Sequence, residues 1–197
     1  MPNLALFDFD GTITHADTFT PFLHFAVPRW RIAAGGVALS PMIAGYKLGL
    51  VSAPTMRAYL VAAGFRGRLK AEVQSAGERY GNDVIPGVLR SEAMAKIAWH
   101  KERGDRVVVV SASLDVYLSV WCRSLDLDLI CSELEEREGV LTGRYRRGDC
   151  TGKEKARRVV ERYDMSSYPV VFAYGDTPED RDMLELAHKK YYRWREV

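Results

Sequence analysis

The chain has 197 residues, of which 47% are hydrophobic and 27% charged, the composition of a globular protein with an apolar core. The 28 basic and 26 acidic residues leave a net charge of +2, which argues against a nucleic-acid-binding protein. Three cysteines without C-x-x-C spacing argue against a disulfide framework and a zinc site, and the N-terminus lacks the basic region of a secretory signal. We therefore expect a cytoplasmic protein of one domain, or of one domain carrying a large insertion.

Short apolar segments alternate with helix-like segments along most of the chain. Buried strands are predicted at residues 3–9, 106–111, 125–131 and 169–174, and helices at 88–103, 114–123, 152–163 and 179–188. This alternation predicts an α/β fold with a doubly wound parallel sheet. Because ligands bind at the carboxyl ends of the strands in such folds, the polar clusters that follow three of these strands are expected to form one site.

Residues 15–86 do not follow this alternation. Their segments resemble helices separated by prolines and glycines, which predicts a helical cap domain inserted after the first strand. Residues 1–14 and 87–197 would form the α/β core domain. Within the core, residues 133–146 predict a β-hairpin with Gly139 in its turn, and the C-terminal KKYYRWREV segment favours an edge strand.

Residues 32–51 form an unusually apolar part of the predicted cap, with Lys47 as their only charge. The segment is long enough to span a membrane, but Pro41 and four glycines favour a pair of buried cap helices instead. A surface that contacts lipid is the other alternative, and the Arg-Trp-Arg triplet at 29–31 suits such an interface.

The first strand ends in FDFDGT, which places Asp8 and Asp10 two residues apart. In a regular strand both carboxylates point to the same side, where they repel each other unless a cation lies between them. Carboxylate oxygens suit Mg²⁺. Gly11 and Thr12 then let the backbone turn tightly and direct amide groups toward an anion, although a polar turn without any ligand would have the same pattern.

Ser111, Ala112 and Ser113 follow the valines of the second strand, where a hydroxyl and free amides can bind an anion, or where a serine simply caps the next helix. Lys153 and Lys155 lie at the start of a later helix, where either can neutralise a phosphoryl oxygen.

Two aspartates follow the 169–174 strand. Asp176 lies next to the turn, where it can meet Asp8 and Asp10 around a metal ion. Asp180 is at the start of the next helix, where it can cap that helix or orient the metal ligands.

The order of these four motifs, each in its strand or loop context, resembles the haloacid dehalogenase superfamily of phosphatases. The helical insertion between the first two motifs resembles its phosphoserine-phosphatase-like branch, subfamily IB. The resemblance implies a Rossmann-like core and a Mg²⁺-dependent phosphomonoester hydrolase. Asp8 would be the nucleophile that forms an aspartyl-phosphate, and Asp10 the general acid and base.

The same resemblance assigns the ligands. Mg²⁺ would be held by the carboxylates of Asp8 and Asp176 and by the backbone carbonyl of Asp10. Asp180 would orient these ligands without contacting the metal. The phosphoryl group would be bound by Gly11, Thr12, Ser111, Ala112 and one lysine. Lys155 is preferred because related lipid phosphatases have a C-x-G-x-x-K pattern, which residues 150–155 match, but Lys153 stays open.

Residues of the cap would determine which substrate is bound. In phosphoserine phosphatases an acid at the position of Asp17 binds the substrate's ammonium group, although Asp17 also suits a helix N-cap. Arg57, with Arg66 and Arg68 as alternatives, could bind a substrate carboxylate. The apolar cap, in contrast, resembles that of the phosphatidylglycerophosphatase C lipid phosphatases. The substrate therefore stays open between a lipid phosphate and a small phosphate such as phosphoserine or histidinol phosphate.

Two functions of other classes also fit the sequence. A catalytically silent binding module would be expected to lack one of the site residues, and all of them are present. A membrane-attached interaction protein would be built around residues 32–51, and peripheral membrane contact through the cap would fit an enzyme too. The sequence makes no prediction of oligomeric state.

Overall fold

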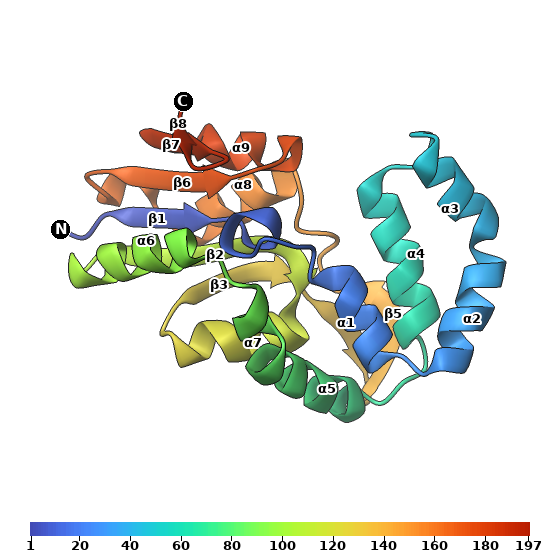
Figure 1. Cartoon of the computed structure of the whole chain (residues 1–197). Helices are drawn as coiled ribbons and strands as arrows, with labels where there is room; N and C mark the ends of the chain where they lie inside the picture. The colour runs from blue at the N-terminus through green and yellow to red at the C-terminus, as the bar shows by residue number, and fades with distance from the viewer.

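A computed structural model describes residues 1–197 and contains a six-stranded sheet of order β3-β2-β1-β6-β7-β8 (Figure 1). All neighbouring strands pair in parallel except the last two. The strands are β1 (Leu4–Phe7), β2 (Arg106–Leu114), β3 (Asp128–Ser132), β6 (Val171–Gly175), β7 (Lys189–Tyr192) and β8 (Arg195–Glu196). The predicted parallel α/β fold is confirmed. The C-terminal segment, predicted as an edge strand, forms β7 beside β6 and then β8 at the edge of the sheet.

Helices cover both faces of the sheet, as the side chains of β1 show. Leu4 and Leu6 pack with α8 (Lys153–Arg162) and α9 (Arg181–Leu184), whereas Ala5 and Phe7 pack on the other side with α6 (Ser91–Glu102) and α7 (Asp115–Ser124). All four β1 residues are completely buried, as expected of a strand between two helical layers. This double coverage explains why the strands appear as uninterrupted apolar runs in the sequence.

Two predicted elements have different bounds in the structure. β2 continues to Leu114, so Ser111 lies within the strand, at an irregularity in its pairing with β3. The helix predicted at 179–188 is a short 3₁₀ turn, Pro178–Asp180, followed by a single helical turn in α9. Similar 3₁₀ turns occur at Ile85–Val88 and Met165–Ser167.

The inserted segment is helical, as predicted. A tight turn at Phe9–Ile13 leads into α1 (Phe19–Ala26), α2 (Arg29–Ala38), α3 (Ser40–Lys47), α4 (Ala53–Phe65) and α5 (Lys70–Asp83). Helices α1 to α4 lie beyond the carboxyl ends of the strands, on the right of Figure 1. Helix α5 packs closely on α7. The absence of a side chain on Gly77 allows this, since a Cβ atom there would lie only 3.0 Å from Cβ of Val116. The boundary between core and cap at residue 86 stays a prediction.

The predicted hairpin consists of β4 (Leu134–Arg137) and β5 (Val140–Tyr145), with Gly139 in the turn at a φ of +79°. Its strand β5 also pairs with the connection between α4 and α5, where Leu141 accepts a hydrogen bond from the N–H of Gly67 and donates one to the carbonyl of Arg68. The hairpin therefore attaches the cap helices to the core.

The prediction of a buried helix pair at residues 32–51 is wrong. Neither α2 nor α3 contains a buried residue, and Val37, Leu48 and Leu50 are 78%, 74% and 80% exposed. Helix α4 packs against both helices of this pair, and their small residues leave little apolar surface to bury. No helix in the structure has the length and apolar character needed to cross a membrane.

Candidate active site

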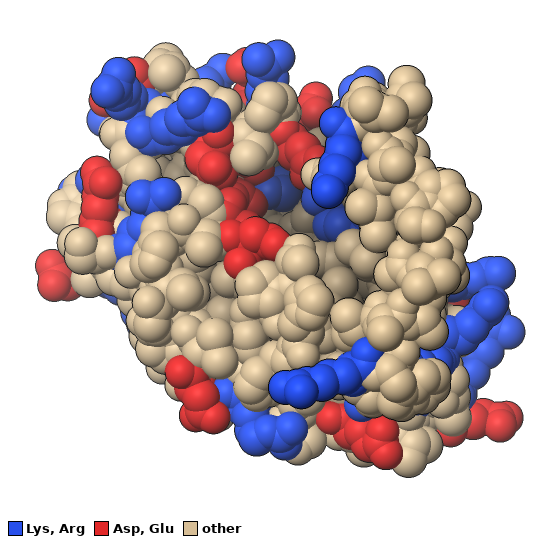
Figure 2. All heavy atoms as spheres, turned by 45° about the vertical axis from the view of Figure 1, so that its right-hand side comes forward, with Lys and Arg blue, Asp and Glu red and all other residues tan.

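A cavity of about 250 Å³ lies at the carboxyl ends of the strands, between the core and the cap. Figure 2 shows acidic side chains gathered in a hollow there, next to a largely uncharged surface. The core lines the cavity with Asp8, Asp10, Ser111, Ala112, Ser113, Lys155, Thr177 and Glu179, and the cap lines it with Asp17, Phe19, Thr20, Tyr46, Ala53, Met56, Arg57 and Leu60.

The ammonium group of Lys155 lies between two carboxylates at the bottom of the cavity. Its Nζ is 2.5 Å from Oδ1 of Asp8 and 2.6 Å from Oδ1 of Asp180, and all three residues are buried. Burial alone would lower the pKa of Lys155, but the two carboxylates outweigh it and raise that pKa. Lys155 therefore stays charged, as a phosphoryl-binding group must.

Lys153 is exposed and does not line the cavity, although the sequence left it open as the phosphoryl ligand. Lys153 and Lys155 are two residues apart at the start of α8, and side chains at that spacing point to different sides of a helix. The structure therefore places Lys155, and not Lys153, against the predicted nucleophile.

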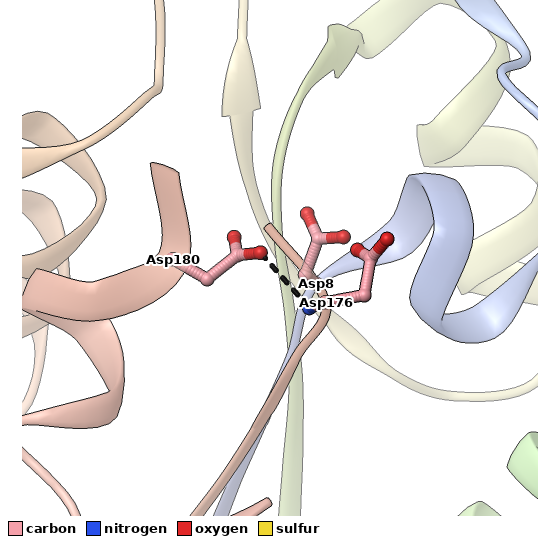
Figure 3. A group of neighbouring side chains, drawn as sticks. All are labelled: Asp8, Asp176 and Asp180. Atoms are coloured by element: carbon pink, nitrogen blue, oxygen red, sulfur yellow. Dashed lines mark hydrogen bonds between the residues drawn. The ribbon is translucent and has the colours of Figure 1, made fainter. Parts of the chain in front are cut away.

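Asp180 fixes the loop that follows β6. Its Oδ2 accepts hydrogen bonds from the backbone N–H groups of Asp176 and Thr177, at 3.1 and 3.0 Å, and from the hydroxyl of Thr177. Figure 3 shows the bond to the backbone of Asp176 and the three aspartates at one edge of the sheet. Burial opposes ionisation, but Lys155 and the donors of Thr177 together outweigh it and lower the pKa of Asp180. Asp180 thus caps the 3₁₀ turn, as the sequence allowed, and its role in orienting metal ligands stays a prediction.

Three carboxylate oxygens, one each from Asp8, Asp176 and Asp180, lie within 4.8 Å of one another. Both oxygens of Asp180 are already occupied by hydrogen-bond donors, which leaves Asp8 and Asp176 to hold a cation. Burial raises the pKa of Asp8 well above its usual range, although Lys155 opposes this rise. A further positive charge nearby would stabilise the ionised carboxylate. Hard oxygen ligands of this kind fit Mg²⁺.

Gly11 and Thr12 position Asp176 and do not line the cavity. The hydroxyl of Thr12 donates a 3.1 Å hydrogen bond to Oδ1 of Asp176. Gly11 has a φ of +86°, and a Cβ atom there would lie 2.8 Å from Cγ of Asp176. In the structure the Thr12 hydroxyl contacts the predicted metal ligand Asp176, and phosphate binding by the backbone N–H groups of this turn stays a prediction.

The carboxylate of Asp10 is held by three donors. Oδ1 accepts 2.6 Å hydrogen bonds from the N–H and the hydroxyl of Thr18, and Oδ2 accepts one of 2.5 Å from the hydroxyl of Ser113. Burial raises the pKa of Asp10, and these donors oppose the rise. The sequence predicted Ser113, like Ser111, as an anion ligand or a helix cap, and not as a hydrogen-bond donor to Asp10. Nothing in the sequence marks Thr18.

Ser111 and Ala112 both line the cavity, as expected. The hydroxyl oxygen of Ser111 accepts a 3.0 Å hydrogen bond from the N–H of Ser113, and this is its one hydrogen bond in the structure. Its own proton is therefore available to a ligand in the cavity.

Asp17 and Arg57 reach the cavity from the cap, but both are engaged by other groups. The carboxylate of Asp17 accepts hydrogen bonds from the N–H groups of Phe19 and Thr20, which start α1. Nε of Arg57 is 2.7 Å from Oδ2 of Asp149, and its Nη2 is 3.1 Å from Oε2 of Glu179. Arg57 thus links α4 to the core. Arg66 is exposed, and neither it nor Arg68 lines the cavity.

The chain belongs to the haloacid dehalogenase-like hydrolases, whose sequence profile matches residues 5–185. It is 32% identical over 203 residues to protein CicA of Caulobacter vibrioides, covering 98% of this chain and 86% of the relative. A protein of unknown function from Bordetella pertussis has a similar structure, with a TM-score of 0.77 and 22% identity, over 98% of this chain and 90% of the other. A probable phosphoserine phosphatase from Vibrio cholerae gives a TM-score of 0.70 at 16% identity, over 98% and 56% of the two chains.

The family match confirms the superfamily predicted from the four motifs, and the phosphoserine-phosphatase-like branch stays a prediction. The low identity of the solved structures makes them evidence for the fold alone.

Proposed function

We propose that the chain is a Mg²⁺-dependent phosphomonoester hydrolase that acts through an aspartyl-phosphate on Asp8. The observation that carries this proposal is the contact of Lys155 with Asp8 in the cavity, with Asp176 beside Asp8, because it combines a nucleophile, a fixed positive charge and a second carboxylate. Phosphoryl transfer requires little more than such positioning and charge stabilisation.

In the first step, an oxygen of Asp8 attacks phosphorus and the bond from phosphorus to the ester oxygen breaks. Asp10, whose raised pKa favours the protonated acid, gives its proton to the leaving oxygen. Thr18 and Ser113 hold the Asp10 carboxyl group in place for this transfer.

In the second step, ionised Asp10 takes a proton from water, and the water oxygen attacks phosphorus. The bond between phosphorus and Asp8 breaks, which releases inorganic phosphate and restores the carboxylate. Lys155 and the free hydroxyl proton of Ser111 are the groups that would bind the phosphoryl oxygens. Bound Mg²⁺, held by Asp8 and Asp176, would neutralise charge on the phosphoryl group.

The rest of the cavity supports an ester with an uncharged leaving group. Tyr46, Met56 and Leu60 are among the cap residues that line it. Phosphoserine would need free partners for its ammonium and carboxylate groups, and the obvious ones, Asp17 and Arg57, already have partners. Phosphoserine and histidinol phosphate are therefore less favoured than a phosphate on an apolar alcohol.

The test is phosphate release from p-nitrophenyl phosphate with and without Mg²⁺. We expect activity that EDTA abolishes and Mg²⁺ restores, and a phosphoenzyme that acid quenching traps. Asp8→Asn should lower kcat by a factor of about 10³ or more, since it removes the nucleophile. Asp83→Asn, at an exposed position of α5, is the matched control and should retain activity. Full activity of Asp8→Asn would refute the proposal.

A further inference from the structure

A second cavity, of about 200 Å³, lies among helices α1, α2, α3 and α4 of the cap. Leu23, Val27, Ile32, Leu39, Ile43 and Ala63 give it mostly apolar walls, and we call it the apolar slot. Three glycines also line it, which widens the space between α2 and α4. Empty apolar cavities of this kind cost stability, because their walls lose packing contacts.

The apolar slot adjoins the active-site cavity. Thr20 of α1 and Leu60 of α4 line both spaces, so the two spaces share part of their walls. The active-site cavity contains Asp8, Lys155 and Ser111, whereas most side chains that line the slot are apolar. A ligand that fills both spaces therefore has a phosphate at one end and an apolar chain at the other.

Arg31, a charged residue that lines the apolar slot, already has hydrogen-bond partners within the protein. Its guanidinium donates to the backbone carbonyls of Gly64 and Arg66, at 3.3 and 2.7 Å. His24 also lines it and is largely exposed. The segment from 18 to 71 contains no acidic residue, so no acid from these helices repels an anionic substrate as it enters.

We propose that the apolar slot binds the hydrocarbon tail of the substrate, which makes the substrate class an amphipathic phosphomonoester: a phosphate on a long-chain or acylated alcohol. This inference rests on the proposed function, because it places the phosphate at Asp8. Each methylene that enters the slot gains about 0.8 kcal/mol, which is about a fourfold increase in affinity. The tail thereby supplies the binding energy that a small phosphate ester lacks.

The first test is a series of n-alkyl phosphates from butyl to decyl, kept below the concentration at which they aggregate. We expect kcat/KM to rise about two- to fourfold per methylene until the slot is full, and then to level off. Hydrolysis of all chain lengths at the same rate would overturn the tail-binding proposal while leaving the proposed function intact.

Paired variants locate the effect. Leu39→Asp puts a charge into the slot and should lower the decyl-to-butyl ratio of kcat/KM at least tenfold. Val37→Asp adds the same charge two residues away in α2, at a position that is 78% exposed and outside the slot, and should leave the ratio unchanged. Ile43→Asn is a second slot variant if Leu39→Asp fails to fold. Equal ratios in the wild type and in both folded slot variants would overturn the proposal.

Binding measurements separate the two proposals. Alkylphosphonates cannot be hydrolysed at the P–C bond, so calorimetric titration reports binding alone. Tighter binding of decylphosphonate than of butylphosphonate, lost in Leu39→Asp, supports the slot even if no ester is hydrolysed, in which case the proposed function fails by itself. Equal binding of the two phosphonates would refute the slot.

The amphipathic ester could reach the slot as a dissolved monomer or from a lipid bilayer. The two sources are distinguished by offering the same long-chain phosphate as monomers and within zwitterionic vesicles. Faster hydrolysis of monomers identifies the dissolved ester, and faster hydrolysis in vesicles identifies the bilayer. Either result supports tail binding when the chain-length dependence is present.

Discussion

Gly11 and Asp176 are in contact although they come from the ends of different strands: a Cβ atom on Gly11 would lie 2.8 Å from Cγ of Asp176. The hydroxyl of the neighbouring Thr12 also bonds to the Asp176 carboxylate. The turn after β1 therefore shapes the position of a carboxylate that follows β6. In this site the glycine is needed both for its positive φ and for the space it leaves.

Gly11→Ala should impair the enzyme more than it impairs the fold. We expect kcat/KM for p-nitrophenyl phosphate to fall at least tenfold and the Mg²⁺ concentration for half-maximal activity to rise, because Asp176 is displaced. Gly49→Ala is the matched control, since Gly49 also has a positive φ, of +73°, but nothing lies within 4 Å of its missing Cβ. Each substitution should cost about 1 kcal/mol of unfolding free energy. Equal activities of the two variants would contradict this role of Gly11.

Lys155→Met should affect both stability and activity. Removing the ammonium leaves the buried carboxylates of Asp8 and Asp180 facing each other, which should lower the free energy of unfolding by about 3 kcal/mol. We also expect kcat to fall about 10²-fold or more, since a charge on the phosphoryl group is lost. Lys153→Met, at the exposed neighbour, is the control. A larger loss of activity in Lys153→Met than in Lys155→Met would assign the phosphoryl ligand differently.

Arg57 and Asp149 should be coupled in stability, because their ion pair joins α4 to the core with side chains only 18% and 8% exposed. A double-mutant cycle with Arg57→Met and Asp149→Asn should give a coupling energy of about 1–2 kcal/mol by urea unfolding. If Arg57 instead binds a substrate carboxylate, Arg57→Met would selectively lower kcat/KM for phosphoserine relative to p-nitrophenyl phosphate. We expect no such selectivity.

Asp115 should make the stability depend on pH. Burial raises its pKa to about 6, although the carboxylate accepts a hydrogen bond from the N–H of Leu134. The unfolded chain titrates near pH 3.9, so between about pH 4 and 6 the folded state binds more protons, and stability falls as pH rises. Asp115→Asn keeps an acceptor for Leu134 without the charge.

We therefore expect Asp115→Asn to be more stable than the wild type by up to about 2 kcal/mol at pH 7 to 8, with the difference disappearing below about pH 4. Urea unfolding at pH 4, 6 and 8 measures this, with Asp83→Asn at an exposed position as the control. A stability difference that grows toward acid pH would have the wrong sign and would contradict the raised pKa.

Much of the core could be predicted because its signals are local. A parallel strand that is buried on both faces needs a continuous apolar run, and the residues that follow it mark the ligand-binding edge. Asp8, Asp10, Ser111 and Asp176 were found in this way. The structure brings Asp8, Asp10 and Ser111 to one cavity and places Asp176 beside Asp8.

Residues whose role depends on a distant neighbour could not be predicted in this way. Thr18 holds Asp10 only because the turn after β1 folds back toward α1, and Arg57 is occupied only because Asp149 and Glu179 of the core face α4. The apolar pattern of α2 and α3 predicted burial, but burial requires covering elements, and in the structure neither helix contains a buried residue.

The sequence by itself determined the α/β core, the helical insertion and the aspartates at the sheet edge, because strand patterns and motif spacing are properties of adjacent residues. Only the tertiary structure showed that Lys155, and not Lys153, contacts Asp8, and that the apolar slot adjoins the cavity at Asp8. Both depend on which face of a helix is turned toward another element, and that orientation is set by packing between segments far apart in the chain.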